Sequence, residues 1–222
     1  GLTSFRLVIT PDAHVTWTQD VMGNAVATVA FPFATDSLMI ESHATLTLGA
    51  VAWPIFDIAA SAICYPFRYG DDEWTDLGAL TVPQHPESKD RLRDWTRAFI
   101  SGTPTDTLAL LKDICAGVSA AIAYRQRDDE GTQSPIETLD RRWGSCRDFA
   151  VLFVEAVRCL GFGARIVSGY LDNRAENLIG QNLAGSTHAW AEVYVPGAGW
   201  ITFDPTNRSV GGFNLVPVAV GR

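Results

Sequence analysis

The sequence predicts an α+β fold in which a small antiparallel β module precedes a larger core of helices and strands. Short β-branched runs separated by turn residues fill residues 1–50, helical periodicity dominates residues 88–160, and strand-like runs return over residues 164–203. We therefore expect three parts: the β-rich N-terminal module at 1–50, an extended connection at 51–87, and the core at 88–222.

The first part alternates apolar and β-branched runs with turn signals. The step Met22-Gly23-Asn24 is typical of a hairpin turn, because Gly and Asn tolerate the left-handed backbone that such turns need. Strands this short are most simply arranged as an antiparallel module. The runs predicted as strands are Leu7–Ile9, Val15–Trp17, Ala25–Phe31, Leu38–Ile40 and Ala44–Leu48.

Prolines and an acidic triplet mark residues 51–87 as a connection. Proline lacks the N–H that a central strand or a helix interior needs, so frequent prolines favour extended chain on the surface. The triplet Asp71-Asp72-Glu73 lacks the spaced oxygen ligands and the glycine of a calcium loop, so we expect no metal site there. The prolines are Pro54, Pro66, Pro83 and Pro86.

Residues 88–160 carry the patterns that are typical of helices. Apolar residues at spacings of three and four predict helices over most of residues 88–124. A capping Ser134, Pro135 at the first helical position and Glu137 three residues after the cap predict the start of a short helix. A further long helix is predicted to begin near Cys146 and to stop before two glycines. Strands are then predicted at Ala164–Leu171, His188–Val195 and Trp200–Phe203.

The composition is that of a folded globular protein. Of 222 residues, 47% are hydrophobic and 10% aromatic, which suffices for a buried core. The net charge of -8 disfavours nucleic acid and anionic lipid as partners. The most apolar stretch, residues 46–63, is broken by Gly49, Pro54 and Asp57, so no membrane span is expected. Four cysteines without a CxxC pair indicate reduced thiols and a cytoplasmic location.

Cys146 stands at the predicted start of the last long helix. The unsatisfied N–H groups and the positive end of the helix dipole favour a thiolate at this position. Arg147 adds positive charge, and the first-turn N–H groups, including that of Cys146, can stabilise an oxyanion. The alternative is a small buried apolar residue, which is our interpretation of Cys64, Cys115 and Cys159.

A thiolate nucleophile needs a base, and His188 is the histidine in the most suggestive surroundings. Strand alternation places His188, Trp190, Glu192 and Tyr194 on one face, and such a polar and aromatic face is typical of a cleft wall. The alternative is a surface histidine on an edge strand. That surface interpretation is the one we give to the remaining histidines, His14, His43 and His85.

Asp204 ends the next predicted strand and is the candidate to orient His188. The alternative for Asp204 is a turn-capping role. If Tyr194 pairs with Trp200, Asp204 lies one diagonal step from His188 on the same face of the sheet. If Val195 pairs with Trp200 instead, Asp204 lies on the opposite face and the set is broken. We predict the first register.

Aromatic residues near these positions are expected to bind substrate. Trp143, Trp190 and Tyr124 are the predicted walls of the cleft, and core packing is the alternative for each of them. The segment from Asp172 to Ser186 is rich in Asn and Gly, and we expect it to form a movable rim over the cleft.

Several blocks of the sequence resemble the transglutaminase-like superfamily, a branch of the papain-like cysteine enzymes. The resemblance implies a papain-like core, in which helices pack on an antiparallel sheet, and a catalytic triad of Cys146, His188 and Asp204. Residues 1–50 resemble the β-rich N-terminal region of bacterial members, which carry further strands before it, so this module is expected to be shortened. The blocks are Gly144–Ala150, Glu155–Tyr170, Thr187–Tyr194 and Gly199–Thr206.

The resemblance implies covalent acyl transfer on a peptide or protein substrate, without a cofactor or a metal. The Cys146 thiolate attacks a carbonyl, His188 protonates the departing amine, and a second nucleophile resolves the thioester. We favour water as that nucleophile, which makes the protein a cysteine peptidase or amidase. The alternatives are a transglutaminase that transfers the acyl group to an amine, and a non-catalytic interaction module that binds through residues 1–50. The oligomeric state is left open.

Overall fold

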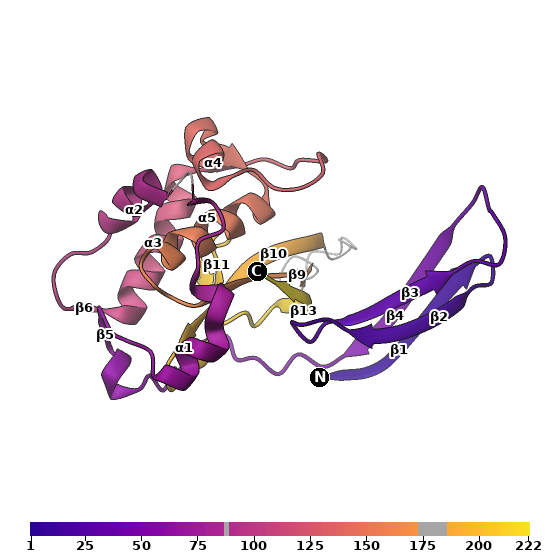
Figure 1. Cartoon of the computed structure of the whole chain (residues 1–222), viewed down its shortest axis with the longest axis horizontal. Helices are drawn as coiled ribbons and strands as arrows, with labels where there is room; N and C mark the ends of the chain where they lie inside the picture. The colour runs from indigo at the N-terminus through magenta and orange to yellow at the C-terminus, as the bar shows by residue number, and fades with distance from the viewer. Residues whose placement is uncertain (87–88, 173–185) are drawn as a thin grey trace, which may run out of the picture. The chain divides into compact units, whose positions relative to one another are not determined.

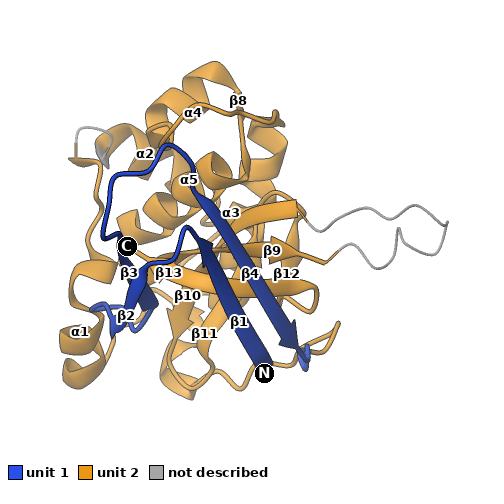
Figure 2. Ribbon diagram, turned by 90° about the vertical axis from the view of Figure 1, so that its right-hand side faces the viewer, with its two compact units in different colours: residues 1–50 blue, residues 51–222 orange. Residues whose placement is uncertain are grey.

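The computed structural model describes residues 1–86, 89–172 and 186–222. Contacts divide the chain into two compact units, Gly1–Ala50 and Val51–Arg222 (Figure 2). The first unit holds two separate antiparallel pairs of strands, and the second holds the helices and a five-stranded sheet. The α+β class is therefore confirmed.

The first unit is built from two pairs of strands. Strand β1 (Leu2–Thr10) pairs with β4 (Met39–Leu46), and β2 (His14–Gln19) pairs with β3 (Ala25–Ala30). The predicted turn between β2 and β3 is confirmed, with Gly23 at φ +82 and its N–H donating to the Asp20 carbonyl at 3.0 Å. The two runs predicted at 38–40 and 44–48 form one strand, β4, because residues 41–43 continue the pairing with β1.

Residues 51–87 differ from the extended connection that their prolines predict. They contain helix α1 (Asp71–Leu77), strand β5 (Cys64–Tyr65) and two short 3-10 helices, η1 (Ala60–Ala62) and η2 (Gly78–Thr81). The acidic triplet occupies the first turn of α1, where the positive end of the helix dipole stabilises carboxylates. Apolar side chains between the prolines pack against the core, and this burial holds the segment to the second unit. These side chains are Phe56, Ile58, Tyr65 and Phe67.

Four further α-helices lie on one side of the second unit (Figure 1). They are α2 (Lys89–Arg97), α3 (Thr107–Ala121), α4 (Pro135–Arg141) and α5 (Cys146–Cys159). The predicted cap of α4 is confirmed, since the Ser134 hydroxyl accepts a hydrogen bond from the Glu137 N–H at 3.2 Å. Two strands, β7 (Ala123–Tyr124) and β8 (Trp143–Gly144), pair in parallel beside the start of α5, and β6 (Thr105–Asp106) pairs with β5.

The sheet of the second unit is antiparallel throughout, in the order β12-β11-β10-β9-β13. Tyr194 pairs with Trp200, so the predicted register is confirmed. Two strands near the C-terminus, β12 and β13, were not predicted. The five strands are β9 (Ala164–Leu171), β10 (Ser186–Val195), β11 (Gly199–Asp204), β12 (Ser209–Val210) and β13 (Leu215–Gly221).

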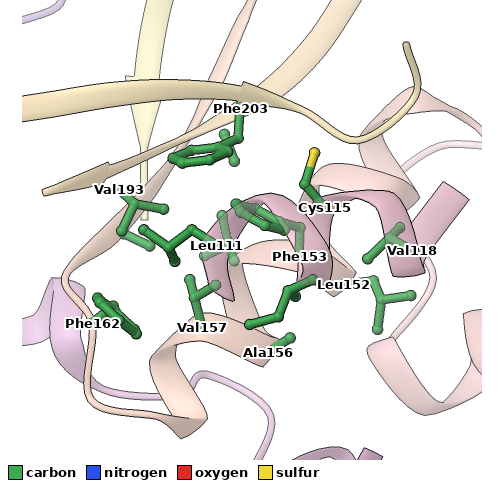
Figure 3. Close-up of a cluster of buried hydrophobic side chains, with 14 of the residues drawn as sticks. Leu111, Cys115, Val118, Leu152, Phe153, Ala156, Val157, Phe162, Val193 and Phe203 are labelled. Carbon is green, nitrogen blue, oxygen red and sulfur yellow. The ribbon is translucent and has the colours of Figure 1, made fainter. Parts of the chain in front are cut away.

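Helix α5 is the centre of the core. It packs on β9 and β10 with one side, and on α2, α3 and α4 with the others. Figure 3 shows Phe153 of α5 facing Phe203 of β11, and their ring centroids are 5.4 Å apart. Burial of such apolar surface is the main stabilising contribution to the fold. Because α5 is fixed on every side, its first residue is held in one place against the sheet.

Candidate functional site

Cys146 is the first residue of α5, and the residues before it shape this helix start. Ser145 is the N-cap, and its backbone N–H and hydroxyl donate to the Asp148 carboxylate at 2.8 and 2.9 Å. A Cβ at Gly144 would lie 2.8 Å from the Asp148 Cβ, so glycine is needed there for the close approach. The sequence pattern Gly-Ser-Cys-Arg-Asp therefore builds a capped helix start that presents a thiol.

Asp148 is fully buried and ties the preceding loop to this helix start. Its carboxylate also accepts hydrogen bonds from Nη2 of Arg127 at 3.0 Å and from the Gln133 N–H at 2.8 Å. Burial raises the pKa of Asp148, but these hydrogen bonds outweigh it and hold the pKa below its usual value. The Arg147 guanidinium donates to the carbonyls of Arg127 and Asp129, so its charge is directed to the same loop.

His188 joins the thiol to a buried carboxylate. Its Nε2 lies 2.8 Å from Oδ2 of Asp204, and its ring is hydrogen-bonded to Cys146. Burial disfavours the imidazolium, but the hydrogen bonds and negative charges of Asp204 and Cys146 outweigh burial and raise the pKa of His188 to about 9. The imidazole is therefore held in its protonated form near neutral pH.

The environment of Cys146 favours the thiolate. Burial raises the pKa of the thiol, but hydrogen bonds from His188 and from the N–H groups of Ala189 and Arg147 outweigh it, so the pKa is lowered. Cys115 provides the contrast, because burial and then the charge of Asp204 raise its pKa to about 12. Cys115 lies in the hydrophobic core, as expected (Figure 3).

Asp204 is held by donors on both of its oxygens. It is 1% exposed, and Oδ1 accepts hydrogen bonds from the N–H groups of Thr206 at 3.0 Å and Asn207 at 3.2 Å. Nδ2 of Asn207 donates to Oδ2 at 2.7 Å. Sequence reasoning missed Asn207, although an Asp whose side chain can accept from N–H groups two and three residues ahead is a known turn signal.

The three predicted wall residues have different surroundings. Trp190 is 1% exposed and packs with Val167 and Leu215, so the prediction that it contacts substrate is corrected. Its ring stacks near that of His188, at 6.1 Å between centroids, and so supports the imidazole from the interior. The side chain is apolar and large, which makes burial its most stable environment.

Tyr124 lies at the surface near the thiol, and Trp143 stands three residues before Cys146 in the chain. They stand on β7 and β8, where Tyr124 pairs with Gly144. Tyr124 is exposed, and burial followed by the charge of Cys146 raises its pKa. Trp143 is half-buried, and the guanidinium groups of Arg125 and Arg141 each lie over its ring, 5.4 Å from the centroid.

The described part of the chain also bears on metal binding and on membrane spans. Residues 1–86, 89–172 and 186–222 contain no group of three or more His, Cys, Asp or Glu side chains arranged to hold a metal ion. No helix among those residues is both long enough and apolar enough to cross a bilayer. The rim expected at 172–186 lies almost entirely outside the described residues.

Comparison with curated proteins finds relatives of undefined activity. The chain is 35% identical to an uncharacterized protein of Mycobacterium leprae over 89 residues, which are 40% of this chain and 31% of that protein. It is 30% identical to an uncharacterized protein of Mycobacterium tuberculosis over 146 residues, which are 62% of this chain and 45% of that protein. The chain thus spans less than half the length of either relative.

A solved structure matches the whole chain, and a family model matches part of the second unit. The crystal structure of a candidate cysteine protease from Cytophaga hutchinsonii matches 100% of this chain and 71% of that chain, with a TM-score of 0.69 and 19% identity. At this identity the likeness concerns the fold. Residues 93–205 match the family model of the transglutaminase-like superfamily, named for the transglutaminase core. This chain therefore belongs to the transglutaminase-like superfamily.

Proposed function

We propose that this protein is a cysteine peptidase or amidase that cleaves a peptide or protein substrate through a thioester on Cys146. One observation carries the proposal. The His188 imidazole is hydrogen-bonded both to the Cys146 thiol at the start of α5 and to the buried Asp204 carboxylate. Nucleophile, base and orienting carboxylate in such contact are typical of covalent acyl transfer.

The first half of the reaction forms the thioester. The Cys146 thiolate attacks the carbonyl carbon, and the carbonyl electron pair moves onto oxygen. N–H groups in the first turn of an α-helix have no acceptor within the helix, so the N–H of Cys146 is available to bind that oxyanion. When the oxyanion collapses, the C–N bond breaks and the His188 imidazolium gives its proton to the departing amine.

The second half regenerates the enzyme. Neutral His188 takes a proton from water, the resulting hydroxide attacks the thioester carbonyl, and the Cys146 thiolate leaves. Asp204 keeps the imidazole in one orientation through both halves. If an amine takes the place of water, the same steps give an amide, which is the transglutaminase alternative.

The proposal is tested first by the pH dependence of thiol reactivity. Iodoacetamide labels each cysteine, and mass spectrometry assigns the label. We expect Cys146 to react well below pH 8, faster than the exposed Cys64, and to lose this advantage in His188→Ala. If Cys146 reacts no faster than Cys64, or if His188→Ala reacts like the wild type, the proposal is wrong.

The second test separates hydrolysis from transfer. A library of peptides and glutamine-containing proteins is incubated with wild type and with Cys146→Ala, with and without a primary amine. Hydrolysis that needs Cys146 and that the amine does not divert supports the peptidase or amidase. Incorporation of the amine in preference to water identifies the transferase instead.

We also propose a cytoplasmic location, because Cys64, Cys115 and Cys146 carry free thiols.

A further inference from the structure

We infer that Asn207 is a positioning residue for the His188 and Asp204 pair, an inference that rests on the proposed function. Its side-chain Nδ2 donates to Oδ2 of Asp204 at 2.7 Å, and the same oxygen lies 2.8 Å from Nε2 of His188. Nδ2 also lies 3.4 Å from Nε2 of His188. One amide group therefore touches both members of the pair.

The amide completes a set of four contacts around the Asp204 carboxylate. Oδ1 accepts from two backbone N–H groups, those of Thr206 and Asn207, and Oδ2 accepts from His188 and from the Asn207 side chain. The carboxylate cannot rotate without losing some of these contacts. Because Oδ2 is held from a second direction, it stays in position to receive the imidazole N–H.

Asn207 differs from a core residue because it is exposed to solvent. Asn207 is exposed, while Asp204, to which it binds, is 1% exposed. Asn207 therefore reaches the surface while its amide contacts a buried carboxylate. Because the side chain is exposed, Asn207→Ala opens no cavity in the core, and its cost in stability is limited to the hydrogen bond that it gives to the carboxylate. A change in thiol activation after substitution then reports on the pair and not on unfolding.

The test is the pH profile of Cys146 alkylation by iodoacetamide between pH 5 and pH 10. Without the amide, Asp204 stabilises the imidazolium less well, so more of the protein carries the neutral thiol and imidazole in place of the thiolate and imidazolium. We expect Asn207→Ala to react about fivefold more slowly at pH 6, the effect of one ordinary hydrogen bond, and to match the wild type at pH 10.

A second variant makes the test specific for the donated hydrogen. Asn207→Asp keeps the shape of the side chain, but the introduced carboxyl donates only while it is protonated. Two carboxyl groups in contact share a proton, which raises the pKa of one of them. We expect Asn207→Asp to react like the wild type at pH 5, where the carboxyl donates, and to depart from it by pH 8, where the ionised carboxylate no longer donates and repels Asp204. A deficit that does not change with pH overturns the inference.

Ser119→Ala is the control for loosening of the loop. The Ser119 hydroxyl donates to the Pro205 carbonyl in the same loop, and it has no hydrogen bond to the pair in the described structure. It should lower the melting temperature and leave the pH profile unchanged. If Asn207→Ala gives the Ser119→Ala pattern, or the wild-type profile because water replaces the amide, the inference is wrong and the proposed function stands. If wild-type Cys146 reacts no faster than Cys64, the proposed function fails first.

Discussion

Replacing Asp148 by alanine tests whether the helix start that presents the thiol depends on one buried carboxylate. The change removes the acceptor for two donors of Ser145, for Arg127 and for the Gln133 N–H. It also leaves the Arg127 side chain, which is 9% exposed, without its buried partner. Breaking a buried pair in this way costs about 3–5 kcal/mol, so we expect a loss of about 4 kcal/mol in the free energy of unfolding.

Asp140→Ala is the matched control, because Asp140 also pairs with an arginine, Arg91, but at the surface. These two side chains are 54% and 60% exposed, so losing the pair should cost less than about 1 kcal/mol. Urea unfolding followed by circular dichroism measures both variants. Equal losses for Asp148→Ala and Asp140→Ala would refute the reasoning.

The stability that Asp148 contributes should change with pH in one direction. The folded-state pKa of Asp148 lies below the usual pKa of an aspartate, so its contribution to stability is present above about pH 4. That contribution is lost as the pH falls through the lowered pKa. The difference between wild type and Asp148→Ala should therefore shrink on acidification, and a difference that grows would contradict the assignment of a stabilised carboxylate.

Two other buried charged groups, His188 and Glu155, give further predictions. Because His188 has a pKa of about 9 and acts as the acid, hydrolysis should decline as the pH rises through about 9, in a rate profile measured on any substrate found. Its contribution to folding stability is fully present below about pH 6.5, the unfolded value, and is lost over the same rise. Glu155→Ala removes the partner of Arg158 and the acceptor of the Gln84 and His85 N–H groups. We expect a loss of about 3–5 kcal/mol in the free energy of unfolding and faster hydrogen exchange at those two N–H groups. An unchanged exchange rate would show that Glu155 does not hold that segment.

The sequence predicted that Cys146, His188 and Asp204 lie close together, because each stands beside a strong local signal. The Cys follows a glycine and a capping serine, the His lies near the start of a strand with regular alternation, and the Asp ends the strand after the next turn. Local patterns of this kind define helix starts and strand faces. The register then needed only one pairing, that of Tyr194 with Trp200.

The errors arose where packing at long range decides the structure. Trp190 shares a face with His188, but alternation does not reveal that Val167 and Leu215 cover that part of the face. The prolines of residues 51–87 concealed a segment whose apolar side chains find the core. Strand β13 was missed because Pro217 is unfavourable in a central strand. The sheet accommodates it at an edge, with a register shift between Pro217 and Ala219.

The pairing of β10 with β11 has a consequence for the order in which the site forms during folding. His188 and Asp204 belong to one hairpin, so their contact spans few residues and has a low contact order. Cys146 reaches them only when α5 docks on the sheet, which requires contacts of much longer range. A hairpin can therefore assemble the base and its orienting carboxylate early, whereas activation of the thiol waits for the docked helix. A local opening that separates α5 from β10 would take the Cys146 thiol away from His188, while the contact between His188 and Asp204 within the hairpin stays intact.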